Sequence, residues 1–490
     1  MKQLFYLLII LLCFVPFTNA QTNFEFRGVW IASVENIDWP SKKGLSVDEQ
    51  IVEFRHIIAM HKRNGMNAIF MQIRPAGDAF YPSQYEPWSE YLTGKQGLPP
   101  TPYYDPLAFM IAETHKQGLE FHAWLNPYRA VFNVNKSSIA PSHITKIHPE
   151  WFLVYGTTKF FNPGLQEVRN LVSNVVKDLV TRYDLDGIHM DDYFYPYRIA
   201  GKEFPDQKTY EQSGTKLSKD DWRRSNCDSV IKQLYLTIRA ANPNVKFGIS
   251  PFGVWRNKSQ DPNGSNTKAG QTNYDDLYAD ILLWLKMGWI DYVVPQLYWE
   301  RGHKLCDYDT LLAWWNNHTY DKHLYIGHGI YRVNTTAAWR DKNEIPKQIQ
   351  ALRQYATTQG SVYFSSKNFE TNANGWNDSL RNNYYALPAI IPPMPWIDSV
   401  PPAKPLVSVL NKTAFNIVYK GSEAIKGFAF FALPKLVDAN MKLATLLYIT
   451  NTTTTEFDRT KSIAPADNRL FVAAVDKNNN VSEWVELKEY

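Results

Sequence analysis

The stretch DLDGIHMDDYFYP, residues 184–196, contains four aspartates, two of which are adjacent at Asp191 and Asp192. A short apolar run precedes this pair, and aromatic residues follow it. Because like charges repel and a buried carboxylate is costly, such a pair indicates a solvated loop, a metal site or part of a catalytic site. The apolar run itself predicts a short buried strand that ends at the two carboxyls.

The same pattern of an apolar strand with a polar exit recurs along the chain, mostly with helix-like segments between the strands. Continuous apolar runs of this kind are typical of parallel strands that are covered on both faces. Eight such units over about 340 residues predict an α/β fold, a TIM (β/α)8 barrel with long loops. An open doubly wound sheet is the alternative, but no glycine-rich phosphate fingerprint follows the first strand. The predicted strands are 26–33, 67–73, 120–127, 187–193, 246–253, 292–299, 323–330 and 361–366.

Helix termini are marked by residues that cap backbone groups. Ser46 and Glu49 predict a capping box at the start of the first helix, and Gly65 is expected just beyond its end. Asp105 is predicted to cap the next helix. No clear long helix precedes the strand 323–330, and a helix at about 344–358 is predicted to end at Gly360.

The chain divides into four predicted parts. Residues 1–20 read as a signal peptide, residues 24–385 as the barrel, and residues 386–405 as a proline-rich linker. Residues 406–490 contain short alternating strands with polar turns, which predict a small β-sandwich that resembles a fibronectin type III module.

The N-terminal pattern, the net charge and the cysteines limit where the protein is expected to act and what it is expected to bind. The N-terminal pattern predicts an exported protein that is periplasmic, outer-membrane-associated or extracellular, and Cys13 leaves open a lipid anchor. We expect no transmembrane segment, and a formal net charge of +4 does not favour nucleic acid as a partner. Cys227 and Cys306 do not form a disulfide framework, and no CxxC or HExxH motif is present. We therefore expect no cofactor and no metal.

In a TIM barrel, chemistry lies just beyond the carboxyl ends of the strands. Polar and aromatic residues recur at these exits, which predicts a concave site suited to sugars. The candidate substrate-binding residues are Arg74, Asn126, Arg129, His189, Tyr193, Trp255, Gln296, Tyr298, Trp299 and His328.

Cleavage of a glycosidic bond requires two carboxyl groups facing one carbon atom. Strand alternation places His189 and Asp191 toward the barrel axis, and it places Asp192 toward the helices or a loop. Asp191 and Glu300 are the predicted catalytic pair, with Asp192 as the reserve. Each has a simpler interpretation, since Asp191 and Asp192 can cap a loop and Glu300 can pair with Arg301 on the surface.

Six blocks together resemble the glycosyl hydrolase-like 10 family, over about residues 24–365: FRGVWIASVENIDWPS, MQIRPAGDAFYPS, AWLNPYR, DGIHMDDYFYP, GISPFGVWRN and DYVVPQLYW. The resemblance implies a barrel related to α-amylase-type glycosidases in an exported bacterial protein. It also implies that Asp191 occupies the nucleophile position, with His189 where that pattern has arginine. The acid glutamate expected after the fifth strand is missing, and Glu300 is the substitute.

The sequence therefore predicts an exported glycoside hydrolase that acts on a polysaccharide, with bacterial cell-wall glycan (peptidoglycan) as one candidate. The alternative is a non-catalytic carbohydrate-binding protein on a decayed barrel, which the missing glutamate favours. A third interpretation makes His189, Asp191 and Asp192 a divalent metal site for another hydrolysis.

Overall fold

The computed structural model describes residues 22–465 and 467–488. The predicted signal peptide and Cys13 lie outside these residues. Within the described part of the chain, no helix is long and apolar enough to cross a membrane.

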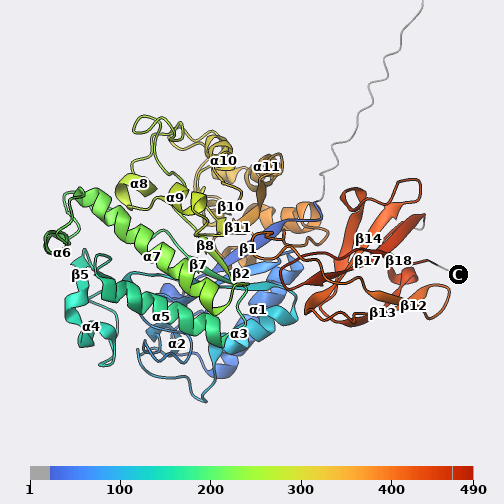
Figure 1. The fold of residues 1–490 in the computed structure, drawn as a ribbon, viewed down its shortest axis with the longest axis horizontal. Coiled ribbons are helices and arrows are strands. Elements are labelled where there is room, and N and C mark those ends of the chain that lie inside the picture. The colour runs from blue at the N-terminus through green and yellow to red at the C-terminus, as the bar shows by residue number, and fades with distance from the viewer. Residues whose placement is uncertain (1–21, 466, 489–490) are drawn as a thin grey trace, which may run out of the picture.

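Eight parallel strands close into a barrel in the order β1-β11-β10-β9-β8-β7-β3-β2 (Figure 1). Closure depends on β1, which pairs with β2 on one side and with β11 on the other. The prediction of a TIM-type barrel is confirmed, and the open doubly wound sheet is excluded. The barrel strands are β1 (Phe26–Ile31), β2 (Ala68–Arg74), β3 (Glu120–Leu125), β7 (Gly187–Met190), β8 (Lys246–Ile249), β9 (Tyr292–Val293), β10 (His323–His328) and β11 (Thr358–Tyr363).

Helices surround the sheet (Figure 1). The longer ones are α1 (Val47–Arg63), α3 (Pro106–Lys116), α5 (Gln166–Arg182), α7 (Lys219–Ala241), α10 (Tyr308–Asn316) and α11 (Glu344–Leu352), and the six-residue helix α9 (Ile281–Lys286) precedes β9. Short helices lie in the loops: α2 (Glu90–Thr93), α4 (Ile144–Ile147), α6 (Gln207–Gln212), α8 (Asn273–Asp276), α12 (Lys367–Thr371) and α13 (Trp376–Ser379). A small antiparallel sheet of β4 (Arg129–Val131), β5 (Phe152–Tyr155) and β6 (Thr158–Phe161) fills the long connection after β3.

The predicted caps at Ser46 and Asp105 are confirmed, including the capping box, and Gly65 adopts the left-handed conformation. The nine-residue helix α10, with Asp307 as its N-cap, forms before β10, where no clear long helix was expected. The helix predicted at about 344–358 is confirmed as α11, but it ends at Leu352. Gly360 lies instead within β11, where a Cβ atom would come within 2.0 Å of the Phe26 carbonyl oxygen. This glycine allows β1 and β11 to approach; it does not end a helix.

The barrel interior is filled by a cluster of large side chains that includes Phe26, Phe70, Tyr292 and Tyr325. Two residues from the proline-rich segment, Ile391 and Met394, belong to the same cluster. The segment also pairs with the chain just before β1, through the Glu25 amide and the Ile390 carbonyl oxygen at 2.9 Å. The amino-terminal end of the barrel is therefore closed by this segment.

The C-terminal part contains two antiparallel sheets and lies beside the barrel (Figure 1). One sheet comprises β12 (Leu406–Val409), β13 (Ala414–Val418) and β16 (Thr454–Asp458). The other comprises β15 (Thr445–Ile449), β14 (Ile425–Pro434), β17 (Asn468–Asp476) and β18 (Val485–Glu486). Phe415, Phe430 and Phe457 lie in the apolar core of this part of the chain. The predicted β-sandwich is confirmed, whereas its resemblance to a fibronectin type III module stays a prediction.

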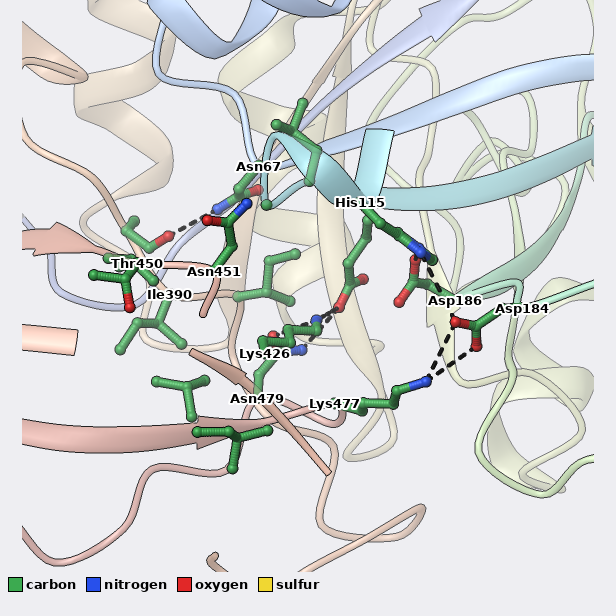
Figure 2. A pocket seen from close by; sticks show the side chains of 18 residues that line it. Asn67, His115, Asp184, Asp186, Ile390, Lys426, Thr450, Asn451, Lys477 and Asn479 are labelled. Atoms are coloured by element: carbon green, nitrogen blue, oxygen red, sulfur yellow. Dashed lines mark hydrogen bonds and ion pairs between the residues drawn. The ribbon is translucent and has the colours of Figure 1, made fainter. Parts of the chain in front are cut away.

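A buried carboxylate joins the two parts at the amino-terminal end of the barrel. Glu120 accepts hydrogen bonds from Lys246 of β8 at 2.6 Å and from Lys426 of β14 at 2.7 Å. Asn479 donates a further bond of 2.9 Å. Figure 2 shows Lys426 and Asn479 side by side, and Lys477 reaching Asp184. Burial alone would raise the pKa of Glu120, but the two lysine charges hold the pKa well below its usual range.

We expect Glu120→Gln to lower the free energy of unfolding by roughly 3–5 kcal/mol, because Lys246 and Lys426 lose their carboxylate in a buried site. Urea unfolding followed by circular dichroism measures the change. Glu113→Gln, which breaks an exposed pair with Arg55, is the control and should cost less than about 1 kcal/mol. Equal effects of the two variants would contradict the structural role of Glu120.

Candidate active site

A cavity of about 460 Å³ opens at the carboxyl end of the barrel strands. Its lining comes from the segments that follow most of the barrel strands, which closure of the sheet brings to one place. The lining residues are Trp30, Ala32, Val34, Glu35, Ile37, Gln72, Trp124, Arg129, Phe132, Asp191, Asp192, Tyr193, Tyr197, Ser250, Phe252, Gln296, Tyr298, Trp299, Tyr331, Arg332 and Phe364.

Ten of these 21 residues are aromatic. Their rings support one another: the Tyr298 and Phe364 rings are nearly parallel with centroids 6.2 Å apart, and Phe252 meets Trp299 edge-on at 5.5 Å. Flat apolar walls with a few polar groups between them suit a ligand that has both apolar faces and hydroxyl groups, as sugar rings do.

Asp191 is buried at the exit of β7 and is held by three donors. Asn126 donates to one carboxylate oxygen, Trp124 donates to the same oxygen at 3.3 Å, and the Tyr193 amide donates to the other at 3.3 Å. Burial raises the pKa of Asp191 to about 6, although the nearby Arg129 charge and these donors oppose the shift. The carboxyl is thus fixed in orientation and titrates near neutrality.

Asp192 lines the same cavity, which corrects the prediction that it points toward the helices or a loop. Strand β7 ends at Met190, so strand alternation does not extend to residue 192. Tyr197 donates a hydrogen bond to its carboxylate, and Gln296 is a further partner. Burial, followed by the charge of Asp191, raises the pKa of Asp192 to about 7. The two adjacent carboxyls therefore lie together in one site.

A chain of buried amides orients Asp191. The amides of Ser33 and Val34, just after β1, donate to the Gln72 side-chain oxygen at 3.0 and 2.9 Å. Gln72 donates to Asn126 at 2.6 Å, and Asn126 donates to Asp191. Asn126 is fully buried and is not among the cavity-lining residues. The structure therefore places Asn126 behind Asp191 instead of in the cavity lining, and its role in substrate binding stays a prediction.

Glu300, the predicted partner of Asp191, is not among the residues that line the cavity. The Trp339 indole donates to its carboxylate at 3.0 Å, and Arg301 pairs with Asp309 instead of with Glu300. Beyond β9, which comprises Tyr292 and Val293, the chain still bridges to both neighbouring strands at Gln296, and Glu300 follows in the loop after this point.

Two predicted substrate-binding residues, Arg74 and Trp255, are not among the residues that line the cavity. Arg74 is fully buried and forms an ion pair with Glu86. Trp255 packs against Trp314, with ring centroids 5.9 Å apart. These two side chains stabilise loops at this end of the barrel.

The two histidines predicted to bind substrate are buried among protein partners. His189 contacts Ser250 at 3.0 Å, and His328 contacts Gln348 at 2.9 Å. Burial lowers the pKa of His189 well below its usual value and that of His328 to about 4. Both are neutral residues of the barrel and are not among the cavity-lining residues.

Five predicted residues do line the cavity: Arg129, Tyr193, Gln296, Tyr298 and Trp299. The Arg129 guanidinium lies 4.9 Å from the centre of the Tyr193 ring, which fixes both side chains in the wall.

Several lining residues escaped the sequence reasoning, including Glu35, Tyr197 and Arg332. Glu35 and the following Asn36 have positive φ angles of 51° and 53°, which is strained for residues with a side chain. No sequence signal marked this turn, whereas Tyr197 lies in the aromatic run behind the two aspartates. Glu35, Asp191 and Asp192 are the carboxyl-bearing residues of the cavity. Across residues 22–465 and 467–488, no group of three His, Cys, Asp or Glu side chains could hold a metal ion.

Comparison with known proteins relates this chain to glycosyl hydrolases. The model of the glycosyl hydrolase-like 10 family matches residues 25–344. The chain is 49% identical over 432 residues to glycosyl hydrolase YngK of Bacillus subtilis, covering 86% of this chain and 84% of that protein. It is 37% identical over 341 residues to glycosyl hydrolase DigH of Escherichia coli, covering 65% and 76%.

Among solved structures, the glycoside hydrolase domain of PgaB (BpsB) from Bordetella bronchiseptica aligns with a TM-score of 0.46 and 13% identity. That alignment covers 74% of this chain and 99% of the PgaB domain. The family match spans most of the barrel and includes every carboxyl-bearing residue of the cavity. The chain belongs to the glycosyl hydrolase-like 10 family.

Proposed function

We propose that the protein is an exported glycoside hydrolase that cleaves a polysaccharide in this cavity, with Asp191 and Asp192 as its carboxyl pair. The observation that carries the proposal is the burial of two adjacent carboxyls, with pKa values raised to about 6 and about 7, in an aromatic-lined cavity. Glycosidases need one carboxyl that keeps its proton near neutrality and one that is ionised.

The environments of the two carboxyls assign their roles. Asp192 has the higher pKa and is the acid that protonates the oxygen of the leaving sugar. Asp191, fixed by Asn126 and Trp124, is the carboxylate that faces the positive charge developing on the sugar. The Arg129 charge favours the ionised form of Asp191.

Bacterial cell-wall glycan is our candidate substrate, and the N-terminal pattern of residues 1–20 supports export to the compartment where that polymer lies. Incubation of the purified protein with cell-wall glycan, starch and xylan, followed by assay of released reducing ends, tests the substrate.

The alternative function is glycan binding without cleavage. It is favoured by one observation, which is that the exits of β8 and β9 contribute Ser250, Phe252, Gln296, Tyr298 and Trp299 to the cavity but no carboxyl. Retention of glycan in a pull-down with no reducing ends released over a long incubation would establish this alternative and overturn the hydrolase proposal.

Asp192→Asn and Asp191→Asn are each expected to lower kcat by roughly 10²–10⁴-fold, the usual contribution of a positioned acid or base. Glu300→Gln is the matched control, since Glu300 is bound by Trp339 outside the cavity lining, and it should retain activity within about twofold. Loss of activity in Glu300→Gln, with retention in both aspartate variants, would overturn the assignment.

The pH profile of kcat/KM is expected to be bell-shaped, with a falling limb below about pH 6 and another above about pH 7. Below about pH 6, the pKa of Asp191, that carboxylate gains a proton. Above about pH 7, the pKa of Asp192, the acid loses its proton. Because the two groups interact, the measured values belong to the pair. A flat profile from about one pH unit below the pKa of Asp191 to about one unit above that of Asp192 would contradict the proposed roles.

Asp192→Asn is expected to be more stable than the parent protein at pH 8 and equally stable at pH 4. The pKa of Asp192 rises from the ordinary 3.8 to about 7 on folding, so protonation favours the folded state. The stabilisation that the protonated Asp192 gives the folded protein is fully present below about pH 4 and is lost as the pH rises through about 7. The gain at pH 8 should be on the order of 4 kcal/mol, since a change of one unit in a pKa corresponds to about 1.4 kcal/mol, measured by thermal unfolding, with the surface variant Asp321→Asn as control. A loss of stability at pH 8 would show that the carboxylate is not strained.

A further inference from the structure

Arg332 is the last residue of the short 3-10 turn Ile330–Arg332 that follows β10. Its side chain is half-buried and lines the cavity beside Tyr331. Tyr331 in turn packs edge-on against Tyr298, with ring centroids 5.8 Å apart. The guanidinium therefore belongs to the same wall as the aromatic residues at the exits of β9 and β10.

The Arg332 guanidinium lacks a protein partner among the described residues. Its Nε atom is buried without a hydrogen-bond acceptor, and no carboxylate of residues 22–465 and 467–488 forms an ion pair with the group. A buried donor left without an acceptor destabilises the folded protein, and a charged donor does so more strongly. A ligand that supplies an acceptor would remove this cost.

The other arginines near the site are already engaged. Arg74 is paired with Glu86, and Arg129 donates to the Pro75 carbonyl oxygen at 3.3 Å and lies over two aromatic rings. Arg332 is thus the guanidinium of the cavity wall that has no partner among the described residues.

We propose that Arg332 binds a carboxylate carried by the glycan, so that the enzyme prefers an acidic sugar. The planar guanidinium matches a carboxylate with two parallel hydrogen bonds. A phosphate with two negative charges fits less well, because Glu35, Asp191 and Asp192 line the same cavity and would repel it. The inference rests on the proposed hydrolase function and adds a specificity-determining residue to it.

A carboxylate of this kind has two chemical sources, a uronic acid ring or an acidic ether substituent on an amino sugar. The probes are therefore an oligouronate and cell-wall glycan strands that bear free carboxylates, each compared with its methyl ester. The parent protein, Arg332→Met and the control Arg340→Met are assayed on all four. Arg340 is exposed in the same loop.

For the acidic source that is the substrate, the parent protein and Arg340→Met should cleave the free acid with a kcat/KM about 10–100-fold above that of the ester, as expected for a hydrogen bond to a charged group. Arg332→Met should lose this preference by falling to the ester rate on the acid, while its rate on the ester stays unchanged. The source that shows the effect identifies the acidic sugar.

An equal loss on acid and ester in Arg332→Met would overturn the inference, as would equal cleavage of acid and ester by the parent protein. If no glycan is cleaved, calorimetry with the same probes separates the two proposals. Tighter binding of the acid that depends on Arg332 would sustain this inference while the hydrolase proposal fails. Binding that ignores the carboxylate, or no binding of either acid, would overturn both.

Discussion

Closure of the parallel sheet through β1 is the constraint on which the rest of this structure depends. Because β1 pairs in parallel with both β2 and β11, the carboxyl ends of all eight strands meet at one face. Residues separated by as much as 334 positions, Trp30 and Phe364, therefore line one cavity. Gly360 makes the closure sterically feasible, since β1 and β11 leave no room for a side chain at that position.

Within this frame, the site is built around buried carboxyls that the fold does not fully compensate. The amide chain from Gln72 through Asn126 orients Asp191 without removing the effect of burial on its pKa. Asp192 has a partner in Tyr197 but also has a neighbouring negative charge. Such groups lower stability near neutral pH, and the same property gives a carboxyl that can exchange a proton there.

Buried charges that are matched and buried charges that are not both occur in the barrel. At the amino-terminal end, Glu120 is matched by Lys246 and Lys426, and its pKa is held low despite burial. This matched cluster joins the C-terminal sheets to the barrel. At the carboxyl end, Asp191 and Asp192 keep raised pKa values and Arg332 has no partner among the described residues. The matched groups hold parts of the chain together, as Arg74 and Glu86 also do at the carboxyl end, whereas the unmatched groups of the cavity are available to a ligand.

The sequence by itself determined the eight strands, most helices and their caps, the change to antiparallel strands after the proline-rich segment, and the position of Asp191. These depend on hydrophobic periodicity and capping, which are local properties of the chain. It did not determine which exit residues converge. His189 and His328 form hydrogen bonds with other side chains of the barrel, and the buried Asn126 donates a hydrogen bond to Asp191.

Only the tertiary structure decided which carboxyl groups share the cavity. Asp192 lines the cavity just beyond the end of β7 at Met190, whereas the Glu300 carboxylate accepts a hydrogen bond from Trp339 and is not among the lining residues. The same holds for Glu35 and Arg332, which reach the cavity from turns after β1 and β10. The path of an irregular loop depends on contacts distant in sequence, and no periodicity in the chain encodes it.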